Sequence, residues 1–153
     1  MNTPASGHGP FVVGARASLL RTFDDAAVRQ FAKLSGDHNP VHLDEAAAAA
    51  DPRFGARIVH GMLVASLFST LLGEELPGAG TIYLGQELSF RAPVFLGEQV
   101  EASVELIEVR ADKPIGKLRT LVTKADGTVC VQGQATVLLP ARPSAAPSEG
   151  GPR

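Results

Sequence analysis

Groups able to transfer protons are concentrated in one part of this sequence. Asp37, Asn39 and His42 lie within a single short segment, and His60 and Gly61 follow at the start of an apolar run. A carboxylate and an imidazole at hydrogen-bond distance can divide the acid and base roles of a reaction, and each such group contributes roughly 10²- to 10⁴-fold in rate. We therefore expect this segment to carry the chemistry of the protein, with Asp37 and His42 as the acid–base pair.

The same spacing also fits a purely structural turn. Asp37 or Asn39 could accept a backbone N–H in an Asx-turn, and His42 could make a local hydrogen bond. In the catalytic interpretation, the Asn39 amide offers a donor and an acceptor that could position a water molecule between the other two side chains. The spacing alone leaves both interpretations open.

Gly61 offers a different kind of group. It begins a segment predicted to be a helix, and the first N–H groups of a helix have no partner within it and favour negative charge. Because glycine has no side chain, a ligand oxygen can come close to that N–H, as in an oxyanion hole. Tight packing against a strand would equally explain a glycine here, and the neighbouring His60 is expected to be a structural hydrogen-bonding residue.

Metal binding is the alternative use of these side chains. Pro40 prevents His38 and His42 from sharing a helical face, although they are four residues apart. No cysteine and no known zinc-binding spacing accompanies them, so we expect no metal. His38 is expected to face solvent or to form a wall of the site, and Asp44 to cap the next helix. The residues of metal-binding type are Asp37, His38, His42, Asp44 and His60.

Local signals predict two short helices around this segment. Asp24 is a good N-cap for a first helix, which Gly36 ends. Pro40 lacks an N–H group and pushes the residue before it out of the helical region, so residues 37–41 are predicted to form an ordered loop. The alanine-rich segment Glu45–Ala50 favours a second helix.

A third helix is predicted over Gly61–Leu72 and is of a different kind. It has almost no polar face, which is typical of a central helix that other elements enclose. Gly73 and then Pro77-Gly78 are predicted to end it. The segment is too short to cross a bilayer and contains serines, so we expect no membrane-spanning element.

Alternation of apolar and polar residues predicts half-buried strands in the remainder of the chain. We interpret the last four strands as an antiparallel meander, with Asp126 and Gly127 in a hairpin turn. The predicted strands are Ala17–Phe23 and residues 81–92, 100–106, 117–123 and 129–139.

One long, curved antiparallel sheet wrapped around the apolar helix gives all these elements a single core. The expected fold class is therefore α+β, with the hot-dog architecture. Such a sheet leaves unpaired edges that a second copy of the chain can extend. We therefore expect a homodimer.

The 153 residues suffice for one domain. We place it at residues 11–140, between a flexible N-terminal tail (1–10) and a disordered C-terminal tail (141–153), both without a function. A net charge of −2 gives no basic field for nucleic acid or a membrane surface. The N-terminal residues lack a signal-peptide pattern, which predicts a cytoplasmic protein. Cys130, the only cysteine, is expected to be a small buried residue.

The motifs of the central segment resemble those of a known family. Ser35-Gly36-Asp37-His38-Asn39-Pro40-Val41-His42-Leu43-Asp44, with Phe54-Gly55 and Ile58-Val59-His60-Gly61-Met62, resembles the hydratase motif of MaoC-like proteins. The continuation through Leu63–Gly73, Ile82–Gln86 and Ser89-Phe90 is similar to the short (R)-specific enoyl-CoA hydratases that supply polyhydroxyalkanoate synthesis. The resemblance extends from about Leu34 to Pro140 and outweighs the structural interpretation of Asp37 and His42.

The resemblance implies reversible syn addition of water to trans-2-enoyl-CoA, giving (R)-3-hydroxyacyl-CoA. It implies no metal and no other cofactor, because coenzyme A is part of the substrate. It also implies that Asp37 and His42 hold and activate water, that Asn39 orients it, and that the Gly61 N–H binds the thioester oxygen. Ser69 matches a family serine near the pair and is a weaker support residue.

Two further expectations concern the proton assignment and the acyl tunnel. We favour His42 as the base toward water and Asp37 as the proton donor to C2, although the sequence does not decide between this and the reverse. The tunnel is expected to be lined by the buried helix and inner strand faces, with Leu72 and Val137 as candidates. The preferred acyl-chain length is not readable from these side chains.

Three other functions are compatible with the fold. A 3-hydroxyacyl-ACP dehydratase of fatty-acid synthesis would share the loop chemistry and differ in the carrier. An acyl-CoA thioesterase of this architecture often takes a carboxylate from the central helix, and Gly61–Gly73 contains none. A non-catalytic acyl-CoA-binding protein would not need Asp37, Asn39, His42 and Gly61 together.

Overall fold

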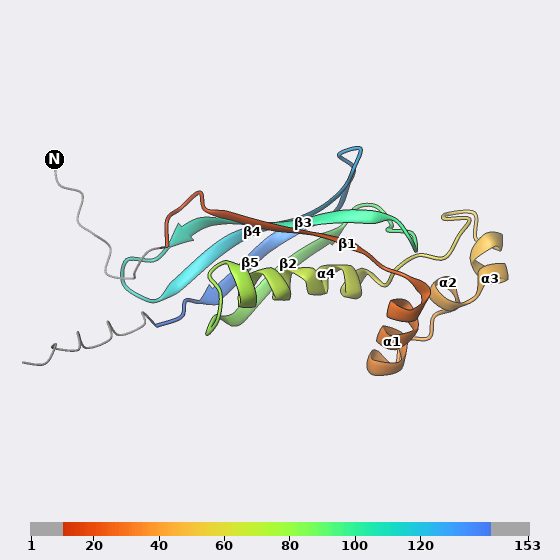
Figure 1. Cartoon of the computed structure of the whole chain (residues 1–153), viewed down its shortest axis with the longest axis horizontal. Helices are drawn as coiled ribbons and strands as arrows, with labels where there is room; N and C mark the ends of the chain where they lie inside the picture. The colour runs from red at the N-terminus through yellow and green to blue at the C-terminus, as the bar shows by residue number, and fades with distance from the viewer. Residues whose placement is uncertain (1–10, 142–153) are drawn as a thin grey trace, which may run out of the picture.

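The computed structural model describes residues 11–141, and the predictions made for the two tails lie outside these residues. The described chain has the predicted α+β class and forms one sheet with one long helix against it (Figure 1). The strands are β1 (Arg16–Thr22), β2 (Ile82–Phe90), β3 (Gln99–Val109), β4 (Ile115–Lys124) and β5 (Val129–Leu138). The helices are α1 (Asp25–Ser35), α2 (Pro40–Leu43), α3 (Glu45–Ala50) and α4 (Gly61–Thr70), followed by a π-helical turn, η1 (Leu71–Glu75).

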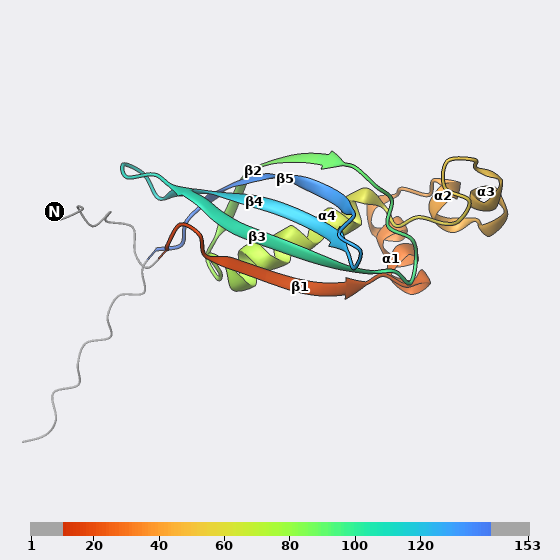
Figure 2. The ribbon, with the colours of Figure 1, turned by 90° about the horizontal axis from the view of Figure 1, so that it is seen from above.

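The strands form an antiparallel sheet in the order β1-β3-β4-β5-β2. β3, β4 and β5 are a meander, as predicted, but β2 is not part of it. It pairs with β5 and forms the edge of the sheet opposite β1 (Figure 2). The prediction of a four-strand meander was therefore wrong for β2.

The segment between β2 and β3 explains this difference. Residues 91–98 are too many for a tight hairpin and contain Pro93, so the chain crosses to the other side of the sheet. The crossing segment is anchored to the chain before α4: the Val59 N–H donates to the Val94 carbonyl at 2.8 Å, and Ile58 forms an isolated bridge with Phe95. Alternation predicts strands, but not which strands are neighbours.

α4 packs along one face of the sheet, against β3, β4 and β5 (Figure 1). Its apolar side chains, including Val64 and Phe68, are buried against inward-facing strand residues such as Leu118 and Val122. The alternating burial of β3 and β4 matches the predicted pattern. The helix is not enclosed on all sides, however. Met62 is 59% exposed, and the polar residues of α4, Ser66, Ser69 and Thr70, are exposed as well.

Of the two predicted end signals, Gly73 does not end the helix, whereas Pro77-Gly78 follows its end, because η1 stops at Glu75 with Leu76 as its C-cap. The helix continues through η1, in which the Leu76 N–H donates to the Leu71 carbonyl at 2.8 Å. A glycine ends a helix when it adopts the left-handed conformation, and Gly73 is not among the glycines with positive φ.

α1, α2 and α3 gather at one end of the sheet, beyond the start of α4 (Figures 1 and 2). The predicted start and end of α1 are confirmed. The Asp24 carboxylate accepts from the Ala27 N–H at 2.8 Å, and Gly36 ends the helix with a φ of 83°. Asp44 caps α3 in the same way, through the Ala47 N–H.

The loop predicted for residues 37–41 needs a correction at its end. Pro40 is the first residue of the short helix α2, a position where its missing N–H is not required and its fixed φ is favourable. Asn39 is the N-cap, and its side-chain oxygen accepts from the Val41 N–H at 3.3 Å. His42 is thereby placed on a helical turn.

Two further predictions concern the burial of Cys130 and membrane-spanning helices. Cys130 is fully buried, as expected. Within residues 11–141, no helix is both long enough and apolar enough to cross a membrane.

Candidate active site

Asp37 lies in the turn between α1 and α2. Its N–H donates to the Ser35 hydroxyl at 3.2 Å, and its Oδ1 accepts from the Asn39 N–H at 3.1 Å. The Asx-turn of the structural interpretation is therefore present. It uses only one carboxylate oxygen, and because the side chain is 49% exposed, Oδ2 stays available for chemistry.

His42 is held by its ring in one orientation. Its Nδ1 lies 2.8 Å from the Ile58 carbonyl oxygen. Because a carbonyl can only accept, Nδ1 carries the proton and the neutral ring presents a lone pair at Nε2. That Nε2 lies 3.9 Å from Oδ2 of Asp37, too far for a hydrogen bond but close enough for one water molecule to contact both atoms.

His60 packs against the pair and supports it. Its ring stacks on that of His42 with centroids 3.9 Å apart, and the Phe31 ring lies 4.8 Å away. Its Nε2–H donates to the Asp37 carbonyl at 3.1 Å. Burial lowers the pKa of His60, which favours its neutral form. These contacts agree with the predicted structural role.

Asp37, His42 and His60 each bring a metal-binding atom within 4.8 Å of the others. The geometry of the rings nevertheless disfavours an ion. Imidazole lone pairs lie in the ring plane, and these two rings are stacked with an interplanar angle of 27°. Two such lone pairs do not converge on a point about 2.0–2.1 Å from both nitrogens, the distance that zinc requires.

Gly61 is the first residue of α4, where a helix N–H lacks an intrahelical partner. A Cβ atom at this position would lie 2.8 Å from Cε1 of Phe90, on β2. Both sequence interpretations of this glycine therefore have a basis in the structure: it packs tightly against a strand, and its N–H is the first of a helix.

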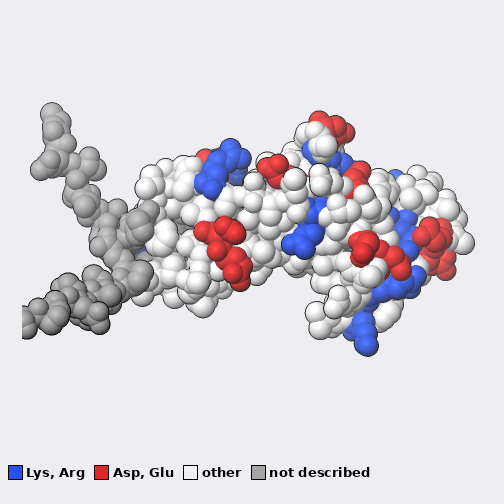
Figure 3. Space-filling model, in the orientation of Figure 1, with Lys and Arg blue, Asp and Glu red and all other residues white. Residues whose placement is uncertain are grey.

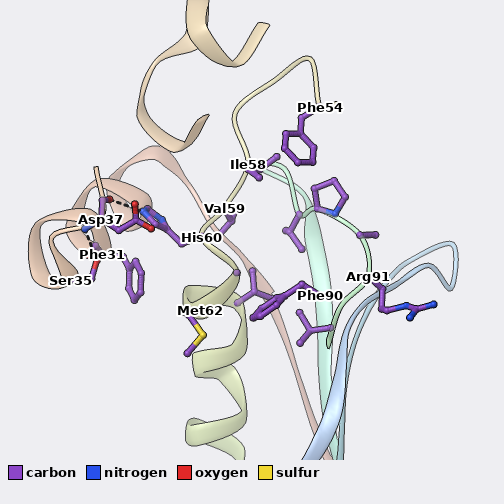
Figure 4. A pocket seen from close by; sticks show the side chains of 16 residues that line it. Phe31, Ser35, Asp37, Phe54, Ile58, Val59, His60, Met62, Phe90 and Arg91 are labelled. Atoms are coloured by element: carbon purple, nitrogen blue, oxygen red, sulfur yellow. Dashed lines mark hydrogen bonds between the residues drawn. The ribbon is translucent and has the colours of Figure 1, made fainter. Parts of the chain in front are cut away.

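A cavity of about 730 Å³ opens beside these groups. Asp37 and His60 lie on one side of it, and Phe90 and Arg91 lie across from them, with the start of α4 between (Figure 4). Apart from Ser35, Asp37, His60 and Arg91, the lining residues are apolar or glycine. Such a site suits a ligand with an apolar chain and one polar reacting group. The other lining residues are Phe31, Phe54, Ile58, Val59, Gly61, Met62, Val64, Ala92, Pro93, Val94 and Val131.

Comparison with known proteins identifies the family of this chain. The family model for the MaoC like domain matches residues 13–127, which include every element from β1 to β4. The chain belongs to the MaoC-like domain family.

Two relatives and a solved structure illustrate the similarity. The (R)-specific enoyl-CoA hydratase of Aeromonas caviae is 54% identical over 84% of this chain and 95% of that protein. The structure of an A. caviae (R)-hydratase involved in PHA biosynthesis has a TM-score of 0.83 and covers 85% of this chain and 98% of that one, at 53% identity. A mitochondrial 3-hydroxyacyl-acyl-carrier-protein dehydratase of Solanum lycopersicum is 38% identical over 84% of this chain and 77% of that protein.

Not every residue predicted for the site of this MaoC-like protein lies at the cavity. His42 is buried and does not line the cavity, but it lies next to two residues that do, Asp37 and His60. Asn39 uses its side-chain oxygen for the α2 cap. Ser69 is exposed on α4 and does not line the cavity. Leu72 and Val137 belong to the packed core of the described chain instead of the cavity lining, because their side chains turn into the space between helix and sheet.

Sequence reasoning missed several residues around the MaoC-like site. Phe31, Phe54 and Phe90 line the cavity, and although Phe54 and Phe90 belong to the motifs quoted above, single aromatic residues in separate parts of the chain give no local signal of a shared site. Arg57 was also missed. Its burial depends on acidic partners far away in the sequence, one of them 32 residues distant.

Proposed function

We propose that this MaoC-like protein is an (R)-specific enoyl-CoA hydratase. It adds water reversibly, in the syn sense, to trans-2-enoyl-CoA and gives (R)-3-hydroxyacyl-CoA. The observation that carries this proposal is the oriented pair: the Nε2 lone pair of His42 lies 3.9 Å from Oδ2 of Asp37, beside an apolar cavity. The similarity to enoyl-CoA hydratases supports it.

In the proposed mechanism, His42 takes a proton from a water molecule as the water oxygen bonds to C3. The C2–C3 π electrons move toward the thioester, whose oxygen gains negative charge and is stabilised by the Gly61 N–H. Asp37, protonated at this stage, gives its proton to C2. The proton on His42 then returns to Asp37, because Nε2 and Oδ2 are close enough to exchange it through one water.

The position of the pair supports syn addition. Asp37 and His42 come from one short segment; Asp37 lines the cavity, and Nε2 of His42 lies 3.9 Å from Oδ2 of Asp37. The hydroxyl group and the proton therefore reach the same face of the double bond. Asn39 contributes by fixing the start of α2, and its amide nitrogen is proposed to orient the water.

Coenzyme A is proposed as the carrier, in preference to an acyl carrier protein. A strongly acidic carrier protein is recognised through a complementary basic surface. Residues 24–58, which surround the pair, contain six acidic and four basic side chains, and the face in Figure 3 shows both signs interspersed at this end of the molecule. The central helix segment Gly61–Gly73 contains no carboxylate of the kind that a thioesterase of this architecture often uses.

A homodimer formed through β2 is part of the proposal. β2 is an edge strand and carries exposed large apolar side chains, among them Ile82 at 54%, Leu84 at 53% and Phe90 at 53%. The opposite edge, β1, has arginines at positions 16 and 21, which discourage strand pairing. Phe90 and the exposed Met62 also line the cavity, so a second copy on this edge would complete its wall.

The reaction needs no metal and no cofactor in this proposal, and the protein is proposed to act in the cytoplasm. Activity is expected to survive treatment with a chelator. Ser69, on the exposed face of α4, supports the pair only if the dimer brings it to a site.

The direct test is the loss of the enoyl absorbance of crotonyl-CoA and of longer trans-2-enoyl-CoAs, with chiral analysis of the product. We expect hydration to the (R) alcohol without release of free thiol. Absence of hydration, or an (S) product, would contradict the function. Faster turnover of crotonyl-ACP than of crotonyl-CoA would favour the dehydratase of fatty-acid synthesis, and thiol release would favour a thioesterase.

A further inference from the structure

Arg57 is a buried cation that lies shortly before Gly61, the first residue of α4. It is 6% exposed and lies in the connection between α3 and α4. A guanidinium taken out of water is stable only when its donors are satisfied and its charge is paired. Its partners therefore indicate what the residue is used for.

The partners of Arg57 come from three helices. Its Nε donates to the His42 carbonyl at 2.7 Å, its Nη2 to Oδ1 of Asp25 at 2.7 Å, and its Nη1 to Oε1 of Glu45 at 3.2 Å. Asp25 is the first residue of α1 and Glu45 the first residue of α3, while His42 lies on α2. The rigid, forked guanidinium is suited to hold such a set of acceptors at fixed angles.

The next residue, Ile58, completes the attachment. Its N–H donates to the Val41 carbonyl at 3.2 Å, and its own carbonyl accepts from Nδ1 of His42 at 2.8 Å. The pair Arg57–Ile58 thus holds both the backbone and the ring of His42. α2 has only four residues, too few to be stable without such external contacts.

We propose that Arg57 is a positioning residue for the hydration, which fixes the orientation and tautomer of the His42 ring without touching the substrate. It is not among the residues that line the cavity. The proposal deepens the proposed function and rests on it for the role of His42. By holding the His42 carbonyl and the helix ends around it, Arg57 keeps the Ile58 carbonyl in place to accept the hydrogen bond from Nδ1–H of His42.

The charges around Arg57 are consistent with this role. Hydrogen bonds from Arg57 and then Arg29 lower the pKa of Asp25, so that its carboxylate stays charged. Burial by itself would lower the pKa of Arg57, but its contacts with Asp25 and Glu45 outweigh this effect and raise the pKa above its usual value. Glu45 has an 83% exposed side chain and a longer contact, so Asp25 is the stronger counter-ion.

The test compares Arg57→Lys and Arg57→Gln with the wild type. Lysine keeps the charge but cannot reach three acceptors in the same plane, and glutamine loses the charge. Because misplacement of a reacting group by about 1 Å can cost on the order of 100-fold, we expect kcat for crotonyl-CoA to fall about 10- to 100-fold while KM changes less than about 3-fold. We also expect the ¹⁵N chemical shifts of the His42 ring to move from the Nδ1–H tautomer toward a mixture.

Arg53 provides a matched control. Its side chain is 72% exposed and pairs with Asp51 in the same connection. Arg53→Lys is expected to leave kcat and the His42 shifts unchanged. Should Arg57→Gln fail to fold, Asp25→Asn leaves Arg57 in place while removing its strongest counter-ion, and a smaller change in the same two quantities is expected.

The ring shifts are measured on the free protein, so they test Arg57 even if the hydration assay fails. A folded Arg57→Lys protein with unchanged His42 shifts and unchanged kcat would overturn the proposal. An increase of KM at constant kcat would overturn it as well, because it would place Arg57 in substrate binding.

Discussion

Asp37 and His42 are each held by contacts that leave their reactive atoms free. The Asx-turn occupies Oδ1 of Asp37, and the Ile58 carbonyl occupies Nδ1 of His42. The remaining atoms, Oδ2 and Nε2, lie 3.9 Å apart. The structural contacts and the proposed catalytic roles of these residues are therefore carried by different atoms of the same side chains.

This division allows substitutions that keep the structural contact and remove the chemistry. Asparagine at position 37 can still accept from the Asn39 N–H, and glutamine at position 42 can still donate to the Ile58 carbonyl. We expect Asp37→Asn and His42→Gln each to lower kcat by about 10²- to 10⁴-fold with little change in Tm. Steady-state hydration of crotonyl-CoA and thermal unfolding measure the two effects. Asp44→Asn, which keeps the α3 cap, is the control, and wild-type turnover in either main variant would remove that residue from the mechanism.

His60 links the site to the pH dependence of stability. Burial lowers its pKa below the value of about 6.5 expected for an unfolded chain. Between the pKa of His60 in the folded state and that in the unfolded state, the unfolded chain binds more protons. The contribution of the buried, neutral His60 to stability is therefore complete above about pH 6.5 and is lost as the pH falls toward the folded pKa.

As the pH falls below about 6.5, we expect His60 to lower the free energy of unfolding by up to about 1.4 kcal/mol per pH unit. This slope adds to the slopes of the other titrating residues. Denaturant unfolding of the wild type and of His60→Gln between pH 5 and 8 measures the difference. Equal slopes in the two proteins would show that His60 is not the group responsible.

At the scale of elements, the placement of β2 depends on close backbone contact with β5. Leu88 of β2 pairs with Gly133 of β5. A Cβ atom at position 133 would lie 1.7 Å from the Glu87 carbonyl oxygen, and a backbone oxygen cannot move aside as a flexible side chain can. The glycine therefore allows β2 to form the sheet edge that borders the cavity.

Gly133→Ala is expected to destabilise the protein by about 3 kcal/mol or more, because the strands must separate to admit the methyl group. Gly85, in β2, is the matched control: it has no atom within 4 Å of its would-be Cβ and is not among the glycines with positive φ. Gly85→Ala should leave Tm nearly unchanged. A Gly133→Ala protein as stable as the wild type would contradict the close approach.

At the scale of the whole molecule, one edge of the sheet differs from the other. The β2 edge presents Ile82, Leu84 and Phe90, whereas on β1 the large exposed apolar residue is Leu20, at 60%. An apolar edge next to the open wall of a cavity is the feature that a second copy of the chain would cover.

We expect the protein to have a mass in solution of about twice 15.9 kDa, and Leu84→Lys to shift it toward the monomer, since a charge at the centre of a strand pair is desolvated without a partner. Sedimentation or light scattering measures the mass. Leu20→Lys, on the opposite edge, should stay dimeric. Dissociation by Leu20→Lys instead of Leu84→Lys would place the interface on β1.

The local features of this protein could be predicted from its sequence. The caps at Asp24 and Asp44, the end of α1 at Gly36 and the alternation in β3 and β4 depend on residues close together in the chain. The proposed acid–base residues could also be chosen from the sequence, because their motif lies in one short segment. For these features, the physical cause and the sequence signal have the same range.

Only the tertiary structure decided the rest. It placed β2 beyond β5, turned Leu72 and Val137 into the core, and brought Arg57 to Asp25 across 32 residues. It also selected the His42 tautomer, through a carbonyl 16 residues away. These outcomes depend on which distant groups compete for the same space and the same hydrogen bonds, and a linear pattern of residue types does not contain that information.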